Sequence, residues 1–154
     1  MELKNIKSPK DIKKLSIAQL EDLASQMRKA ILKRTTQIGG HVGPNLGSVE
    51  AIIAMHYVFD APRDQLVYDV SHQAFPHKML TGRADGYLYR EDFEKVGEYT
   101  DPKESPEYDM FYAGHTSPAL SLCVGLAKAR DLKKDKYNVV ALGGDGAMSG
   151  CVAF

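Results

Sequence analysis

The sequence predicts an α/β fold built around a parallel sheet. Two short apolar runs that are typical of parallel strands, at residues 65–70 and 137–142, alternate with longer segments of helical periodicity. Each run ends in a polar or glycine-rich turn. Because ligands of parallel sheets bind at the carboxyl ends of the strands, we expect these two turns to carry the chemistry.

The first long helix is predicted from its start signal, its period and its stop signal. Ser16 and Gln19 have the spacing of a capping box, and Gly39 with Gly40 ends the pattern. The apolar residues between these signals recur at helical spacing: Leu20, Leu23, Ala24, Met27, Ala30 and Ile31.

A glycine-rich segment and a second helix follow. We expect residues 41–47 to form a loop, and Ser48 to cap a helix over residues 49–59. The second helix is apolar on nearly all sides, so we expect it to be buried.

The first strand, at residues 65–70, leads into an irregular middle region. A short helix is predicted over residues 76–80, but residues 81–109 show no sustained period. A loop of that length is usually functional or mobile. We expect Asp69, at the end of the strand, to be an ordinary turn residue.

The last third of the chain predicts a helix and a strand. Pro118 marks a helix start, and the helical pattern runs to about residue 132. The apolar run at residues 137–142 then predicts a buried parallel strand, and a new helical stretch begins after it.

Composition excludes several classes of partner. The chain has 154 residues, with 20 Lys and Arg against 20 Asp and Glu. This balance argues against a role on nucleic acid or on a membrane surface. No apolar run reaches membrane-spanning length, and the first ten residues do not resemble a signal peptide. Two cysteines without a CxxC pair are typical of a reduced compartment, so we expect a cytoplasmic protein.

The most informative motif is Gly144-Asp145-Gly146, which follows the last strand. Unpaired backbone N–H groups at a helix start attract phosphate, and small residues let it approach. The Asp145 carboxylate would repel a bare diphosphate, so the motif favours a divalent cation between the acid and the phosphate. No GxxxxGK[ST] or GxGxxG pattern is present. An ordinary Asp-Gly turn stays an alternative.

The histidines allow more than one interpretation. A zinc site could use His41, His72, His77 and His115. However, Pro76 interrupts any helix that would bring His72 and His77 together. We favour contact with phosphate and hydroxyl groups, or proton transfer, for the histidines beside glycine or at a strand end, which are His41, His72 and His115. A hydrogen-bonded residue without a chemical role is the alternative for each, and it is what we expect of His56.

Five blocks of sequence, in order, carry a family resemblance. They lie at residues 39–47, 56–59, 68–83, 113–117 and 144–148. Together they resemble the N-terminal part of the 1-deoxy-D-xylulose-5-phosphate synthase family, which consists of thiamine-diphosphate enzymes related to transketolase. The His-Gln-x-x-Pro-His-Lys-x-Leu-Thr-Gly-Arg block that begins at His72 is far more specific than Gly-Asp-Gly.

The resemblance implies a doubly wound α/β domain on the diphosphate side of thiamine diphosphate, present here only in part over residues 1–154. On this resemblance, the pyrimidine-binding and C-terminal domains would be absent from residues 1–154. By motif position Asp145 would be a ligand of Mg²⁺, with Gly146 and Ala147 beside the diphosphate. The other positions with an implied contact to the cofactor are His72, Gly114, His115 and Thr116. His41 would face the substrate, which makes His41 and His72 the candidate catalytic residues.

The resemblance also implies the reaction. Pyruvate would lose carbon dioxide, and its two-carbon unit would join glyceraldehyde 3-phosphate, in a homodimeric enzyme of isoprenoid-precursor, thiamine and pyridoxal biosynthesis. We expect the chain alone to be inactive. Ser71 stands where the family usually has Gly, and the loop at residues 82–108 is unlike the typical one. A transketolase-like enzyme with other sugar substrates is therefore one alternative, and a non-enzymatic ligand-binding or assembly module is another.

Overall fold

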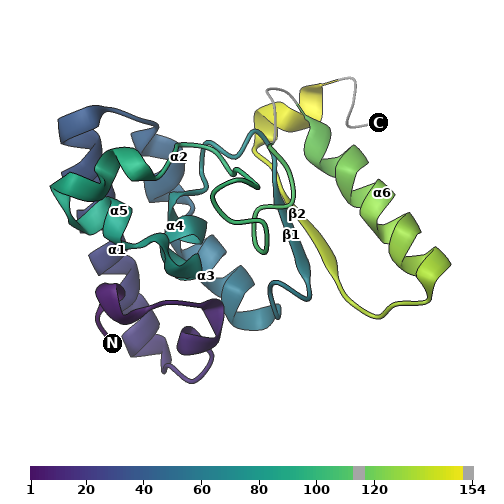
Figure 1. Cartoon of the computed structure of the whole chain (residues 1–154), viewed down its shortest axis with the longest axis horizontal. Helices are drawn as coiled ribbons and strands as arrows, with labels where there is room; N and C mark the ends of the chain where they lie inside the picture. Colours follow the sequence, from purple (N-terminus) through teal and green to yellow (C-terminus); the bar gives the residue numbers. More distant parts are fainter. Residues whose placement is uncertain (113–116, 151–154) are drawn as a thin grey trace. The chain divides into compact units, whose positions relative to one another are not determined.

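The computed structural model describes residues 1–112 and 117–150, and the chain divides into two compact units. The first unit comprises Met1–Asp60 and His72–Glu98, and the second comprises Ala61–Ser71 and Tyr99–Phe154. The first unit is built from helices, and the second contains a parallel sheet (Figure 1). The predicted α/β class is confirmed.

Helices of very different lengths make up the first unit. In chain order they are η1 (Leu3–Asn5), η2 (Pro9–Ile12), α1 (Ile17–Ile38), α2 (Val42–Gly47), α3 (Val49–Val58), α4 (Phe75–Lys78), η3 (Met79–Arg83), α5 (Asp85–Leu88) and η4 (Arg90–Lys95). In the described part of either unit, no helix combines the length and the apolar character that crossing a membrane requires.

Helix α1 forms as its sequence signals predict. The Ser16 hydroxyl accepts a hydrogen bond from the Gln19 N–H at 3.4 Å, and the Gln19 amide oxygen accepts from the Ser16 N–H at 2.9 Å. Gly39 ends the helix at a φ of +82°, where its N–H donates to the Thr35 carbonyl. Of the expected apolar stripe, all residues but Leu20 are buried.

Two expectations for the following segment are wrong. Residues 42–47 form helix α2 instead of a loop, and the Ser48 hydroxyl donates to the Pro44 carbonyl at 2.8 Å instead of capping α3. Helix α3 is buried on one face only, along Val49, Ile52, Ile53 and His56, whereas Val58 on its other side is 68% exposed. The apolar composition of α3 therefore exceeds what the unit buries.

A buried arginine links α1 to the helices that follow the His-Gln block. The guanidinium carbon of Arg34 lies 4.9 Å from the ring centroids of both Phe75 and Tyr87. Its Nη2 donates to the Phe93 carbonyl at 3.1 Å and to the Val96 carbonyl at 2.5 Å. Residues 81–109 are therefore not irregular throughout. Helices α5 and η4 form here because Arg34 and apolar contacts hold them, although their own sequences show no period.

The second unit contains β1 (Gln65–Tyr68), α6 (Pro118–Lys133), β2 (Val139–Leu142) and the short 3₁₀ helix η5 (Asp145–Ser149). The two strands pair in parallel, with Tyr68 opposite Leu142, and α6 lies beside β2 (Figure 1). The Asp64 carboxylate accepts from the Asn138 N–H at 2.7 Å and so sets the register at the start of the pair.

The second strand is less buried than its sequence predicts. All four residues of β2 are half-buried, because the strand has β1 as its one described neighbour in the sheet. The first strand ends two residues earlier than expected. Val70 and Ser71 have φ values of 56° and 65°, which lie outside the extended region and stop the ladder.

Two histidines face each other in the core of the first unit. His56 Nε2 lies 2.9 Å from His77 Nδ1, and both residues are fully buried. Burial is the main cause that lowers the pKa of His56 well below 6.5, and the nearby positive charges of His77, Lys13 and Arg83 lower it further. His56 is hydrogen-bonded, as expected, and its lack of a chemical role stays a prediction.

This pair predicts that acid destabilises the chain. The unfolded chain binds a proton at His56 near its ordinary pKa of about 6.5, whereas the folded chain resists protonation. The contribution of neutral His56 to the free energy of unfolding is therefore fully present above about pH 6.5, and it is lost as the pH falls below that value. Urea unfolding between about pH 8 and pH 5 should show the free energy of unfolding falling by up to about 1.4 kcal/mol per pH unit for this proton.

A His56→Gln variant supplies the control, because it keeps a hydrogen-bonding group at the same place but does not titrate. The difference between the wild-type and variant curves isolates the contribution of His56. Parallel curves over the whole range would contradict the prediction.

Candidate functional site

The first unit brings two of the predicted site histidines together. His41 immediately precedes α2, and His72 lies a few residues before α4. Their rings meet edge to face, with centroids 5.5 Å apart and an interplanar angle of 69°. The two candidate catalytic residues are therefore neighbours, although 31 positions separate 41 from 72 in the numbering.

A buried asparagine joins the two histidine segments. The Asn45 amide nitrogen donates to the His41 carbonyl at 2.6 Å and to the His72 carbonyl at 2.8 Å. The Asn45 amide oxygen accepts from the Phe75 N–H at 2.9 Å. A neutral amide can both donate and accept, so one fully buried side chain satisfies three backbone groups.

Glu98 approaches His41 from the end of the first unit. One carboxylate oxygen, Oε1, accepts from the His41 backbone N–H at 2.9 Å and lies 3.1 Å from His41 Nδ1. Both side chains are partly exposed, at 30% for Glu98 and 43% for His41. The imidazole is therefore tethered and still accessible.

In the second unit, the carboxyl ends of β1 and β2 lie at the same edge of the sheet. Asp69 follows β1, and its N–H donates to the Leu142 carbonyl at 2.8 Å. Its buried carboxylate accepts from the Ala119 N–H at 3.1 Å, in the first turn of α6. The expectation of an ordinary turn residue is wrong: Asp69 fixes the start of α6 against the sheet.

The Gly-Asp-Gly turn occupies the same edge. Asp145 is exposed and begins η5, and its Oδ1 accepts from the Gly146 N–H at 2.9 Å. The Ser117 hydroxyl donates to the Ala147 carbonyl at 2.6 Å, which ties the turn to the start of α6.

A cavity of about 240 Å³ opens beside this turn. It is lined by Asp69, Ser117, Ala119, Leu120, Ala141, Gly143, Ala147 and Met148. Asp145 lies between Gly143 and Ala147 in the sequence, but it is not one of the residues that line the cavity. A volume of this size holds a small group such as a phosphate with its water, not a whole nucleotide-sized ligand.

The turn suits a metal-bound diphosphate. A Cβ added at Gly144 or Gly146 would meet no atom within 4 Å, so the backbone there is open to an approaching group. The exposed Asp145 carboxylate is the hard oxygen donor that Mg²⁺ prefers. Within residues 1–112 and 117–150, no three His, Cys, Asp or Glu side chains are grouped to hold a metal ion. Further ligands would have to come from the diphosphate, water or other residues.

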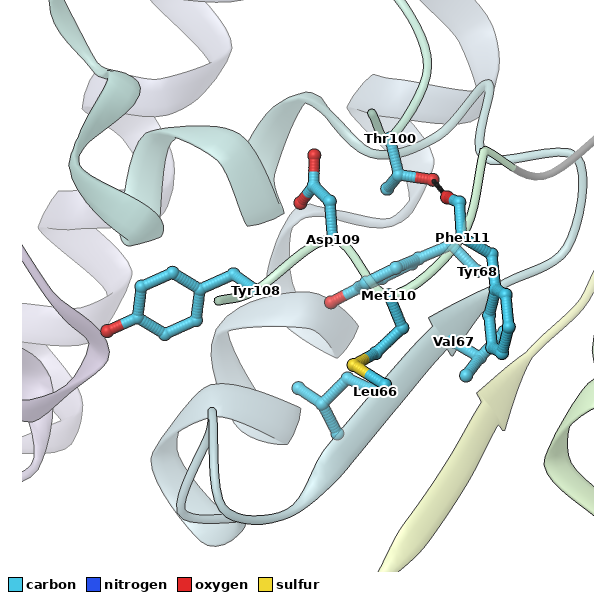
Figure 2. Close-up of a pocket in the computed structure, with 8 residues that line it drawn as sticks. All are labelled: Leu66, Val67, Tyr68, Thr100, Tyr108, Asp109, Met110 and Phe111. Atoms are coloured by element: carbon cyan, nitrogen blue, oxygen red, sulfur yellow. Dashed lines mark hydrogen bonds between the residues drawn. The ribbon is translucent and has the colours of Figure 1, made fainter. Parts of the chain in front are cut away.

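A second cavity, of about 10 Å³, is a packing gap instead of a ligand site. It lies where residues 108–111 cover one face of β1, with Met110 toward Leu66 and Phe111 toward Val67 (Figure 2). The Thr100 hydroxyl donates to the Phe111 carbonyl at 3.0 Å and holds this cover in place. Such a volume admits about one water molecule.

Two residues between the strand and His72 have unusual backbone conformations. Val70 and Ser71 both lie in the left-handed region, which is rare for residues other than glycine and costs most for a β-branched side chain. The buried Ser71 hydroxyl accepts from the Thr100 N–H at 3.0 Å. That hydrogen bond offsets part of the cost.

The predicted site residues thus fall into three groups. His41 and His72 meet in the first unit, and Asp145, Gly146 and Ala147 share one turn in the second. Gly114, His115 and Thr116 lie outside the described residues. The expectation that the turns after the two strands carry the chemistry stays a prediction.

Sequence reasoning missed two residues that hold the histidines. Asn45 stands inside the glycine-rich block, and an asparagine among glycines is a signal that could have been followed. Glu98 lies in a stretch without periodicity, and nothing local distinguishes it from its neighbours.

Replacing Asn45 by Asp should destabilise the first unit strongly. The carboxylate cannot donate, so a buried charge at position 45 would oppose the carbonyls of His41 and His72, and both carbonyls would lose a hydrogen bond. At about 1–3 kcal/mol for each buried group left unsatisfied, we expect a loss of roughly 2–5 kcal/mol in the free energy of unfolding.

The matched control is Asn5→Asp, the same change at an exposed position. It should alter stability by less than about 0.5 kcal/mol. Chemical denaturation of the two variants decides the matter: an equal, small effect of both substitutions would show that the Asn45 amide is not needed.

Comparison with known proteins agrees with the motifs. The family model for 1-deoxy-D-xylulose-5-phosphate synthase matches residues 3–154. The chain is 49% identical over 153 residues to the protein of that name from Dictyoglomus turgidum, which covers 99% of the chain and 25% of that protein. It is 46% identical over 154 residues to the one from Symbiobacterium thermophilum, covering 100% of the chain and 24% of that protein.

A third relative, from Brevibacillus brevis, is 46% identical over 153 residues, covering 99% of the chain and 24% of that protein. The chain thus spans about a quarter of the length of the curated relatives that it matches. Both the family model and these relatives cover nearly every residue of it. The chain belongs to the 1-deoxy-D-xylulose-5-phosphate synthase family.

Proposed function

We propose that this chain is the diphosphate-side part of a thiamine-diphosphate- and Mg²⁺-dependent synthase. The whole enzyme would condense pyruvate with glyceraldehyde 3-phosphate to 1-deoxy-D-xylulose 5-phosphate, with loss of carbon dioxide. The observation that carries the proposal is the exposed Asp145 between two open glycines, at the carboxyl edge of a parallel sheet in a member of this family.

The role of the second unit is to bind the cofactor's diphosphate. Asp145 would hold Mg²⁺ through a carboxylate oxygen, and Gly146 and Ala147 would lie beside the diphosphate. Asp69 and Ser117 would support this turn by fixing the start of α6, at whose N-terminal side Gly114, His115 and Thr116 complete the proposed contacts. When bound, thiamine diphosphate supplies the carbanion chemistry by which pyruvate is decarboxylated.

The role of the first unit is to present imidazoles to the reacting groups. His41 and His72 would contact the substrate and the cofactor, and either ring could hold or move a proton near neutral pH. Asn45 anchors the backbone carbonyls of both histidines, so their separation does not depend on the substrate.

The proposal extends to the setting of the whole protein. The whole protein would be a cytoplasmic homodimer that serves isoprenoid-precursor, thiamine and pyridoxal biosynthesis, and the balanced charge of the chain fits small-molecule substrates better than nucleic acid. The chain alone would be inactive, because one side-chain metal ligand does not make a site.

A transketolase-like enzyme with other sugar substrates is the second candidate. It is favoured by Ser71, a non-glycine residue in the left-handed region beside His72, where the family usually has glycine. The test is to assay the complete product of the gene that encodes this chain with pyruvate plus glyceraldehyde 3-phosphate, and separately with ketose donors. We expect turnover of the first pair, and turnover of ketoses alone would favour the second candidate.

The metal assignment predicts the effect of Asp145→Ala in the complete gene product. Removing the carboxylate should lower Mg²⁺-dependent affinity for thiamine diphosphate by at least about 100-fold and abolish turnover, since a hard cation loses its charged ligand. Calorimetric titration of thiamine diphosphate with and without Mg²⁺ measures the first effect.

Asp135→Ala is the control, because Asp135 is an exposed aspartate of the same unit. Its affinity and turnover should match those of the wild type. Wild-type turnover by the Asp145→Ala enzyme would refute the assignment.

A further inference from the structure

Glu98 contacts both the main chain and the side chain of His41. A single oxygen, Oε1, receives the backbone N–H at 2.9 Å and lies 3.1 Å from the ring Nδ1 of the same residue. Main chain and side chain of His41 are thus tied to one point. This arrangement restricts both the position of the residue and the rotation of its ring.

The backbone next to His41 is shaped to admit this carboxylate. Gly40 has a φ of +123°, and a Cβ at this position would lie 2.8 Å from Glu98 Oε1. The same Cβ would meet the Phe75 ring at 3.4 Å and the Thr35 methyl at 3.6 Å. Glycine is therefore needed at position 40 for Glu98 to reach His41.

The carboxylate also selects one form of the imidazole. An ionised carboxylate only accepts hydrogen bonds, so the proton between the two groups must reside on Nδ1. In a neutral imidazole the lone pair then lies on Nε2, the nitrogen that would serve as a base or as a hydrogen-bond acceptor. A partner that fixes the tautomer in this way is a common device in histidine chemistry.

We propose that Glu98 is the positioning residue that fixes the ring orientation and the tautomer of His41 at the substrate end of the site. Its effect on turnover rests on the proposed function, but the contact itself does not. The opposite end of His41 is held by Asn45 through the carbonyl, so the imidazole presents its Nε2 from a backbone anchored on both sides.

A purely structural role for Glu98 is the competing explanation, and it has a different signature. Because the pair is partly exposed, it contributes little to stability, typically about 0–1 kcal/mol. Losing the carboxylate should therefore change the state of the His41 ring far more than it changes folding. A change in tautomer without a change in stability separates the two explanations.

The experiment uses the complete gene product, labelled with ¹⁵N-histidine, and the variants Glu98→Ala, Glu98→Gln and Glu94→Ala. Glu94 is an exposed glutamate in the nearby helix η4 and serves as the matched control. Long-range ¹H–¹⁵N spectra at about pH 8 report the tautomer of each neutral ring. The His41 signals are identified by their loss in His41→Gln. Thermal unfolding and steady-state kinetics with pyruvate and glyceraldehyde 3-phosphate complete the comparison.

In the wild type we expect the Nδ1–H form of His41 to dominate. Glu98→Ala should convert it to a mixture of tautomers and lower kcat about 10- to 100-fold, as misplaced catalytic groups do, with thiamine diphosphate affinity unchanged within about twofold. Glu98→Gln keeps an oxygen acceptor and should recover part of both effects. Glu94→Ala should match the wild type in every measurement.

Two results would overturn the proposal. One is an unchanged His41 tautomer in Glu98→Ala. The other is a loss of turnover that only follows a loss of thermal stability. If the wild type does not convert pyruvate and glyceraldehyde 3-phosphate, the proposed function fails, and the spectra still decide whether Glu98 sets the His41 ring.

Discussion

The buried amide of Asn45 is the constraint on which the His41 and His72 segments of the first unit depend. It serves backbone groups of His41, His72 and Phe75, which lie 4, 27 and 30 residues away. Aspartate has no donor at neutral pH, and leucine, of similar shape, has neither donor nor acceptor. The spacing of the two histidine backbones is therefore set by a neutral amide.

The parts of the fold that the sequence predicted are those with local signals. Helix α1 carries its cap, its apolar stripe and its terminal glycine within one continuous segment. The pairing of β1 with β2 follows from two apolar runs and the helical segment before the second. Helices α2, α5 and η4 were missed because distant contacts hold them, such as those that Arg34 makes with the segment around Phe93. The burial of α3 was overestimated because apolar character alone does not say how many faces a small unit can cover.

The candidate site residues likewise include some with local sequence signals and others that only long-range contacts reveal. Gly144, Asp145 and Gly146 could be predicted as a motif because they are consecutive in the sequence. His72 could be predicted because it begins a distinctive block of sequence. Asn45 and Glu98 act on residues up to 57 positions away, and no short-range pattern records such a contact. Asp69 was misjudged because its carboxylate works across 50 residues, at the start of α6. Side-chain hydrogen bonds between distant segments are thus the feature of this structure that the sequence alone predicted least well.

The arginine that lies between Phe75 and Tyr87 has a consequence for how the first unit responds to its surroundings. Its attraction comes from the quadrupoles of two rings and from backbone carbonyls, none of which gains a proton in acid. A carboxylate partner would be neutralised at low pH, and its hold on the cation would then weaken. The contacts through which Arg34 connects α1 to α4 therefore do not weaken as the pH falls.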